Sequence, residues 1–288
     1  MVPAPVMTQF HVVGDALLDV LATGMPSIPG WGEDINASSI QCQAGGSALN
    51  TAVHLAGILG RSATVTMHGC VGKDGFALIL QEKLAAAGVR SQLQAIDAPT
   101  GSCMVLSGNS DRAFVTCAGA TGQLGAQHLE EIHSSVAAGV SRVHVHFGGV
   151  YSYGPLRSEL VPFVKKLRAT ATQSRCHVTI SADVNGHIPE HTAGMEEILE
   201  VLDVFKGNDD EARAVAGGVD NPMEKLAAGG RCVMITKGSK GAEYKWKDEA
   251  GEVEGFKVVV EDTTGAGDAC AAGLLAGLVM GMGIGDAA

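Results

Sequence analysis

A glycine turn near the carboxyl end of the chain carries the residues with the clearest chemical potential. Gly265, Ala266 and Gly267 stand immediately before Asp268, and an apolar segment, 269–279, follows them. The two glycines allow a sharp turn and a close approach to a ligand because they carry no Cβ atom. Amides at the start of a helix lack backbone partners and attract anions. Asp268 then has two possible uses, as a helix cap or as a general base beside an anion site, and spacing alone leaves both open.

Carboxylates and amides also gather after two other apolar runs. Asp15 and Asp19 follow the β-like run 10–13, and we expect this first strand to deliver both to its carboxyl end, where open α/β sheets bind ligands. Ordinary loop acids are the alternative. Asn208 and Glu211 open an expected helix after another apolar run, and capping is the commonest use of such an Asn.

Two glycine turns have less specific sequences. Gly45 and Gly46 precede an apolar helix that contains Asn50, as any tight entry turn would. The stretch 236–241 separates two expected strands, as in a plain hairpin. No P-loop sequence is present, so phosphate binding would have to rest on the glycine turn before Asp268.

Taken together, these motifs resemble those of the ribokinase-like (PfkB) family of sugar and nucleoside kinases. The string at 262–268, Asp-Thr-Thr-Gly-Ala-Gly-Asp, is similar to the carboxyl-terminal signature of the family. Gly-Gly-x-x-x-Asn at 45–50, Asn-x-x-Glu at 208–211 and Thr-x-Gly-x-x-Gly at 236–241 match other family motifs. They occur in the family's order and span most of the chain.

The resemblance implies a role for each matched position. Asp268 would be the catalytic base, and the amides of Gly265, Ala266 and Gly267 would form the anion hole. The expected acceptor-binding residues are Asp19, in preference to Asp15, with Gly45, Gly46 and Asn50. The expected nucleotide-binding residues are Asn208, Thr236, Gly238, Ser239, Gly241 and Thr264. Asn208 and Glu211 would position Mg²⁺ through water, Asp262 would border a monovalent cation such as K⁺, and Asp183 and Asn185 would lie near the substrate or phosphate.

The implied reaction is transfer of the γ-phosphate of ATP to a hydroxymethyl group of a small sugar of the ribose, fructose or sugar-acid class. A nucleoside, or a pyridoxal-like or pyrimidine alcohol, is the alternative acceptor, and the aromatic content of only 4% favours a sugar. A second alternative is a non-catalytic ligand-binding or regulatory protein. Family members continue some tens of residues past the Asp268 helix, so we expect the part of the fold that closes the adenine pocket to be missing.

Composition restricts the partners. The net charge of −11 argues against nucleic acid, which needs clustered Lys and Arg. The uncharged stretch 269–285 is short and weakly hydrophobic, which favours a buried helix over a membrane span. Seven scattered cysteines and an amino terminus without a secretory signal are typical of a cytoplasmic protein.

The alternation of strand-like and helix-like segments predicts a three-layer α/β/α fold with a mainly parallel central sheet, as one domain over 1–288. Segments at about 24–44 and 98–119 would form a small β lid, through which a homodimer could assemble. We also expect a strand at 258–260 to lead into the glycine turn. His144 and His146 share one face of an expected strand and favour a structural role over a metal site.

Overall fold

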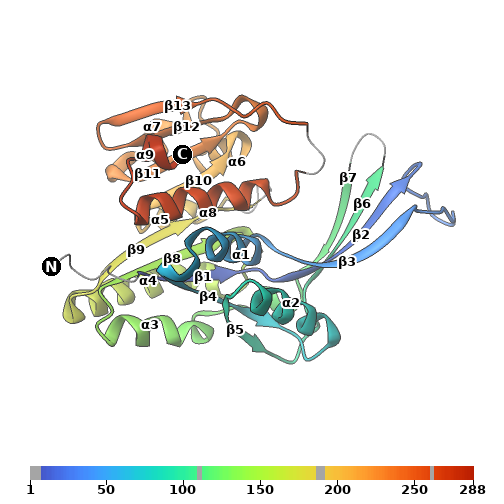
Figure 1. Cartoon of the computed structure of the whole chain (residues 1–288), viewed down its shortest axis with the longest axis horizontal. Helices are drawn as coiled ribbons and strands as arrows, with labels where there is room; N and C mark the ends of the chain where they lie inside the picture. The colour runs from blue at the N-terminus through green and yellow to red at the C-terminus, as the bar shows by residue number, and fades with distance from the viewer. Residues whose placement is uncertain (1–7, 109–111, 186–191, 260–262) are drawn as a thin grey trace.

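The structure is a computed structural model of the whole chain, and it describes residues 8–108, 112–185, 192–259 and 263–288. Its main element is a nine-stranded sheet with the order β13-β12-β11-β10-β9-β8-β1-β4-β5 (Figure 1). The strands are β1 (Thr8–Gly14), β4 (Ala63–Val71), β5 (Arg90–Ala95), β8 (Arg142–Gly148), β9 (His177–Ala182), β10 (Val204–Asn208), β11 (Cys232–Thr236), β12 (Ala242–Trp246) and β13 (Glu249–Val253). Pairings from β5 to β11 are parallel, and β12 and β13 are antiparallel, which confirms the mainly parallel sheet.

Helices cover both faces of this sheet. One core contains side chains of α1 (Ser47–Leu59), α2 (Gly75–Ala86), α8 (Ala266–Val279) and α9 (Ile284–Ala287). The other contains side chains of α3 (Glu130–Ala137), α4 (Leu156–Ser174), α5 (Met195–Glu200), α6 (Asp209–Val215) and α7 (Pro222–Leu226). In β1, Phe10 and Val12 belong to the first core and Val13 to the second, as the two-residue period of a strand requires. Because both faces are buried, the central strands are almost continuously apolar, and the three-layer prediction is confirmed.

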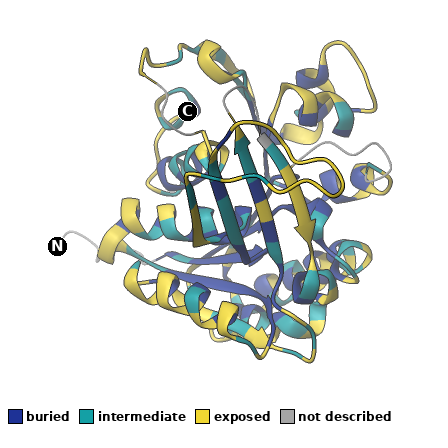
Figure 2. Cartoon of the chain, turned by 90° about the vertical axis from the view of Figure 1, so that its right-hand side faces the viewer, coloured by how far each residue is buried: buried dark blue, intermediate teal, exposed yellow. Residues whose placement is uncertain are grey.

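A second, four-stranded sheet stands off the main body (Figures 1 and 2). We call it the small sheet; its order is β3-β2-β6-β7, formed by β2 (Leu17–Met25), β3 (Ser39–Gly45), β6 (Ser102–Gly108) and β7 (Arg112–Cys117). The expected lid segments contain β3, β6 and β7 but not β2. Asp19 therefore lies within β2, and the expectation that the first strand delivers it is wrong. β1 ends at Gly14, and the chain enters the small sheet almost at once because Leu17–Met25 pairs with both β3 and β6.

The prediction of a strand at 258–260 is wrong for residues 258 and 259, the two that the structure describes. Val258 and Val259 follow the last strand, β13, and lie outside any strand, with Val259 93% exposed. β-branched residues favour strands only where a neighbouring strand and a buried face are available. The apolar run before Asn208 forms β10 only from Val204, because Val201 is the C-cap of α5.

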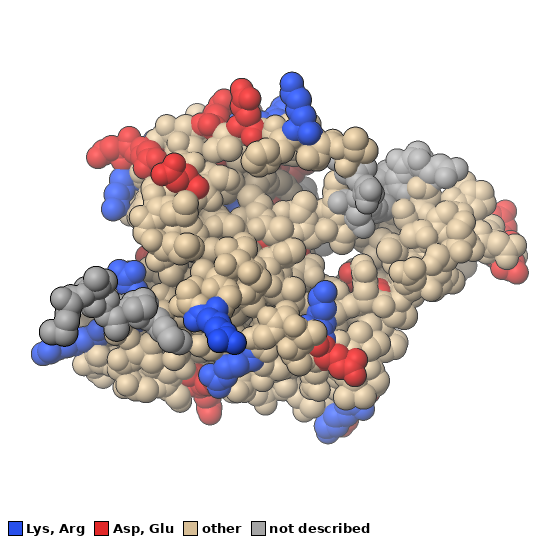
Figure 3. Space-filling view, viewed as in Figure 1, with Lys and Arg blue, Asp and Glu red and all other residues tan. Residues whose placement is uncertain are grey.

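Helix α8 is part of the core, as expected of the stretch after Asp268. Its buried face includes Ala272, Leu274 and Leu275, and Gly277 lies so close to α9 that an added Cβ would be 2.7 Å from the Ala287 Cβ. Across the described ranges, no helix combines the length and apolarity that a membrane crossing would require. On the face shown in Figure 3, the described Lys and Arg side chains are scattered among acidic ones and form no continuous patch.

Candidate active site

The expected site residues converge on the edge where the parallel strands end. β1, β8, β9, β10 and β11 all run toward this edge, so the segments that follow them face one another. Helices α1 and α8 both begin there and pack side by side (Figure 1). The sheet topology therefore brings the amino-terminal and carboxyl-terminal motifs together.

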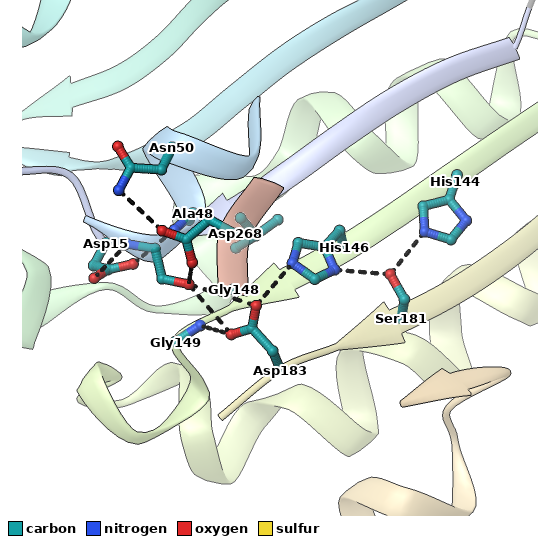
Figure 4. A network of polar contacts seen from close by, with 12 residues as sticks. Asp15, Ala48, Asn50, His144, His146, Gly148, Gly149, Ser181, Asp183 and Asp268 are labelled. Atoms are coloured by element: carbon teal, nitrogen blue, oxygen red, sulfur yellow. Dashed lines mark hydrogen bonds and ion pairs between the residues drawn. The ribbon is translucent and has the colours of Figure 1, made fainter. Parts of the chain in front are cut away.

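Asp268 joins the two motifs directly (Figure 4). Its Oδ1 accepts a hydrogen bond from Ser47 Oγ at 2.9 Å, and its Oδ2 accepts one from Asn50 Nδ2 at 2.9 Å. Both donors belong to α1, whereas the N-cap of α8 is Gly265, with no side-chain cap hydrogen bond. The carboxylate is thus held by a neighbouring helix, and it does not cap its own.

The environment of Asp268 prepares it to exchange a proton near neutral pH. Burial raises the pKa of Asp268 to about 6, and the nearby Asp183 charge adds to this effect. The hydrogen bonds from Asn50 and Ser47 and the positive charge of Lys206 oppose the rise. A carboxyl group whose pKa lies close to the working pH is suited to general-base catalysis.

The glycine turn presents part of the expected anion hole. Ala266 N–H already donates to the Thr263 carbonyl at 3.2 Å, so this amide is not available. The first bond of the helix runs from Ala269 N–H to the Gly265 carbonyl at 2.9 Å. Within the described residues, the amides of Gly265, Gly267 and Asp268 donate no hydrogen bond, so two of the three expected donors, Gly265 and Gly267, remain available.

Lys206 adds a positive charge to this turn. It lies on β10 with 8% of its surface exposed, and a Cβ added to Gly267 would be 3.0 Å from its Nζ. A side chain at position 267 would require this ammonium group to move by a few tenths of an ångström. The turn and the lysine together form a site with free N–H donors and one positive charge, which suits an anion.

Asp15 and Asp19 have different roles. Asp15 is almost fully buried and accepts from the backbone amides of Ser47 at 3.1 Å and Ala48 at 2.9 Å, so it fixes the start of α1. Asp19 is half-buried, and a Cβ added to Gly45 would lie 2.1 Å from its Oδ2. Burial raises the pKa of Asp15 to about 7 and that of Asp19 to about 6. The Asp15 carboxylate is thus engaged with the backbone of α1, and Asp19 stays the predicted ligand-facing acid.

Asn208 and Glu211 form a reciprocal cap at the start of α6. The Glu211 amide donates to Asn208 Oδ1 at 2.9 Å, and the Asn208 amide donates to Glu211 Oε2 at 2.8 Å. This arrangement is a capping box, the structural alternative to a metal site. It leaves these two oxygens engaged with backbone, so a contact with Mg²⁺ through water is the form that fits.

The other expected nucleotide residues lie at the next strand end. Thr236, at the end of β11, is the register partner of Asn208, and the turn with Gly238, Ser239 and Gly241 follows it. Gly238 and Gly241 have positive φ values of 58° and 92°. Thr264 lies in the glycine turn, whereas Asp262 lies outside the described residues.

Several residues of this site were not singled out by sequence reasoning. Ser47 was only a small residue inside the Gly-Gly motif, and Lys206 only a charge at the end of an apolar strand. Asp183 was expected near the substrate, and it lies behind Ser47, whose hydroxyl is 3.4 Å from Asp183 Oδ1. The family resemblance and the strand end pointed to Asp183, but its electrostatic interaction with Asp268 arises only in the folded chain.

Comparison with known proteins identifies the family. The sequence model of the pfkB family carbohydrate kinases matches residues 7–288, almost the whole chain. The chain belongs to this family. It is therefore a phosphotransferase that acts on an alcohol group, within the class of sugar and nucleoside kinases.

Relatives with curated descriptions include kinases of both acceptor types. The uncharacterized sugar kinase YegV of Escherichia coli strain K12 is 28% identical and aligns with 96% of this chain and 84% of its own length. The adenosine kinase of Saccharomyces cerevisiae is 31% identical over 93% of this chain and 81% of its own. The fructokinase of Klebsiella pneumoniae is 27% identical over 94% of this chain and 84% of its own length.

Solved structures have the same fold. Ribokinase from Giardia lamblia superposes with a TM-score of 0.80 at 20% identity, over 95% of this chain and 83% of that one. A putative ribokinase II from E. coli, in complex with ATP and Mg²⁺, superposes with a TM-score of 0.76 at 26% identity. The superposition covers 98% of this chain and 89% of that one. These similarities confirm the ribokinase-like fold.

Proposed function

We propose that this kinase transfers the γ-phosphate of ATP to a hydroxymethyl group of a small sugar of the ribose, fructose or sugar-acid class, with Asp268 as the general base. The observation that carries the proposal is the position of Asp268. Its carboxylate is held by Ser47 and Asn50, has a pKa of about 6, and adjoins the unpartnered amides of Gly267 and Asp268 itself. A base and an anion site thus lie side by side at the start of one helix.

In the proposed reaction, Asp19, Gly45, Gly46 and Asn50 hold the acceptor and orient its hydroxyl toward Asp268. The carboxylate takes the hydroxyl proton as the oxygen attacks the γ-phosphorus in line with the leaving group. The amides of Gly265, Gly267 and Asp268 and the Lys206 ammonium stabilise negative charge on the transferring phosphoryl group. Positioning and electrostatics supply most of the acceleration in such reactions.

ATP and Mg²⁺ are proposed as co-substrate and cofactor because the E. coli relative binds both. Asn208, Thr236, Gly238, Ser239, Gly241 and Thr264 would contact the nucleotide. Asn208 and Glu211 would hold Mg²⁺ through its water shell, and the ion would neutralise charge on the phosphates. A K⁺ requirement through Asp262 remains a prediction from the sequence.

The test is consumption of ATP across a panel of sugars and nucleosides by the wild type and by Asp268→Asn. We expect the wild type to turn over with a small sugar, such as D-fructose or D-ribose. For Asp268→Asn we expect kcat to fall by about a hundredfold or more, with nearly unchanged binding of sugar and ATP. Asn keeps the size of the side chain but cannot accept the proton. Wild-type turnover in Asp268→Asn would remove this residue from the mechanism.

Adenosine is the second candidate acceptor, because adenosine kinases are among the relatives at up to 31% identity. The same panel separates the two acceptors. A kcat/KM for adenosine well above that for every sugar would replace the proposed substrate class and leave the proposed base in place.

We further propose that a second copy of the chain pairs with the small sheet. Met104 and Val115 are register partners on neighbouring strands and are 49% and 60% exposed, and Ile40 on β3 is 69% exposed. Side chains directly across an antiparallel pair share one face. These apolar residues therefore suit a protein contact better than water.

A further inference from the structure

A line of buried polar side chains lies behind the base, on β8 and β9 (Figure 4). His144 Nδ1 is 2.7 Å from Thr179 Oγ1, and its Nε2 is 2.7 Å from Ser181 Oγ. The same Ser181 oxygen is 2.9 Å from His146 Nδ1. His146 Nε2, in turn, is 3.5 Å from Asp183 Oδ2. The line therefore ends on a carboxylate.

The direction of each proton follows from that carboxylate. Next to an ionised Asp183, which only accepts, the favourable tautomer of His146 carries its proton on Nε2 and accepts from Ser181 at Nδ1; at 3.5 Å the Nε2–Oδ2 pair is an electrostatic contact and not a hydrogen bond. Burial lowers the pKa of His144 to about 3, so this ring is neutral, with one donor and one acceptor. Its Nε2–H donates to Ser181, and its Nδ1 accepts from the Thr179 hydroxyl. Every donor in the line points toward Asp183.

Asp183 is therefore a stable buried anion, although only 4% of its surface is exposed. Burial alone would raise its pKa, but the contact with His146, the charge of Lys206 and the amide of Gly149 together hold the pKa below its ordinary value. The Gly149 N–H donates to Asp183 Oδ1 at 2.7 Å. A carboxylate with such donors stays ionised across the neutral range.

Ser47 connects this anion with the base. Its hydroxyl is 2.9 Å from Asp268 Oδ1 and 3.4 and 3.5 Å from the two oxygens of Asp183. When Asp268 is ionised, the hydroxyl donates to it. When Asp268 is protonated, the same oxygen can accept that proton and turn its own toward Asp183. Asn50 Nδ2 can only donate, so Ser47 is the partner that suits both states of the base.

We propose that Asp183 and Ser47 are positioning residues for the base: Asp183 keeps a permanent negative charge behind Asp268, and the Ser47 hydroxyl turns between the two carboxylates as Asp268 gains and loses a proton. This inference rests on the proposed role of Asp268. The proton comes from the acceptor hydroxyl as the new O–P bond forms, and it leaves to solvent before the next cycle. No other group has to change its charge.

Three charged groups, Asp183, Lys206 and Asp15, bear on the outcome. Asp183 favours the protonated form of Asp268 and Lys206 the ionised form. Asp15 also interacts with Asp268 and is itself close to half-protonated at pH 7, since its pKa is about 7. His146 acts through Asp183. Removing the Asp183 charge should therefore make Asp268 more acidic, and removing the Ser47 donor should make it less acidic.

The decisive measurement is the titration of Asp268 by carbon-13 NMR on protein labelled at the aspartate carboxyl carbons. The resonance is assigned by its disappearance in Asp268→Asn. We expect Asp183→Asn to lower the titration midpoint by about one pH unit, the scale of a like charge close by in a buried site. Ser47→Ala should raise the midpoint. Shifts of opposite sign are the signature, because loosened packing would move both variants in the same direction.

A matched pair at position 146 tests the supporting line. His146→Gln keeps an N–H toward Asp183 and should leave the midpoint near that of the wild type, whereas His146→Leu leaves Asp183 without this donor and should lower it. His68→Gln, a buried histidine on β4, controls for burial of a new amide. Thermal unfolding identifies any variant that does not fold. If one of the other variants does not fold, the NMR comparison rests on Ser47→Ala, His146→Gln and His68→Gln.

A midpoint that stays constant or rises in Asp183→Asn overturns the inference. Its failure is separable from failure of the proposed function, because the NMR titration needs no substrate. If the midpoints move as expected while Asp268→Asn still phosphorylates D-fructose at the wild-type rate, the link between the carboxylates stands and the role of Asp268 as base falls.

Discussion

At the scale of single residues, Lys206 is the side chain whose importance is least visible in the sequence. It is buried beside Gly267 and bears on the charge of both Asp183 and Asp268. We expect an ammonium group in this position to have two effects, one on an incoming anion and one on the proposed base, Asp268. Both effects can be measured in one variant.

We predict that Lys206→Met raises the KM for ATP and lowers kcat on the order of tenfold or more, because a charge-assisted contact to phosphate is lost. The acidic limb of the kcat/KM profile should move to higher pH, since Asp268 loses a neighbouring positive charge. Steady-state kinetics from pH 5 to 8 measure both effects. Lys166→Met, on the exposed side of α4, is the control. Unchanged constants for Lys206→Met would exclude a role in phosphate binding.

Sequence motifs predicted the residues of the site that belong to short signatures. Asp268 and Asn50 could be chosen because each stands at a fixed distance from paired glycines. Ser47 and Lys206 could not, because their contacts with Asp268 cross between strands and helices far apart in the chain. The Ala266 amide was expected to face a ligand, and the bond to Thr263 shows why spacing cannot reveal which N–H groups remain free.

At the scale of elements, the small sheet is the part of the fold that sequence reasoning described least completely. The turn residues after Met25 marked a loop, but nothing in Leu17–Met25 distinguished a strand of the small sheet from a continuation of β1. The pairing partners of β2 lie in segments 39–45 and 102–108, so only the assembled sheet defines it. The main sheet was easier to predict, because strand-like and helix-like segments alternate regularly along the chain.

The exposed apolar face of this sheet gives a prediction about assembly. If a second copy covers Met104 and Val115, Met104→Lys combined with Val115→Lys should convert a dimer into a monomer in analytical ultracentrifugation, because two buried charges oppose the contact. Leu78→Lys, at an exposed apolar position on α2, is the control and should leave the assembly unchanged. A monomeric wild type at micromolar concentration would refute the pairing.

At the scale of the whole molecule, buried acids and buried histidines oppose each other in their response to pH. Burial raises the pKa of Asp15 to about 7, so its contribution to stability is full below the unfolded value near 4 and is lost as pH rises to about 7. Burial lowers the pKa of His11 to about 4 and of His68 to about 3. Their contribution is present above about 6.5, the unfolded value, and is lost as pH falls.

We therefore predict that the free energy of unfolding changes little between pH 6.5 and 4.5, because native acids and unfolded histidines take up protons over the same range. In Asp15→Asn, the free energy of unfolding should fall as the pH is lowered from 6.5 to 4.5. In His68→Gln, it should rise over the same range when compared with the change in the wild type. Urea unfolding at several pH values measures these slopes. Identical slopes in all three proteins would contradict the assignment of the buried charges.

The contact between Asp268 and α1 also bears on how activity appears during synthesis. The base and its partner Ser47 are 221 residues apart in the chain. The proposed acceptor-binding residues Asp19 to Asn50 are therefore translated well before the proposed base, Asp268. A nascent chain that has not yet reached Asp268 lacks that base, so phosphorylation would begin only once Ser47 and Asp268 have met.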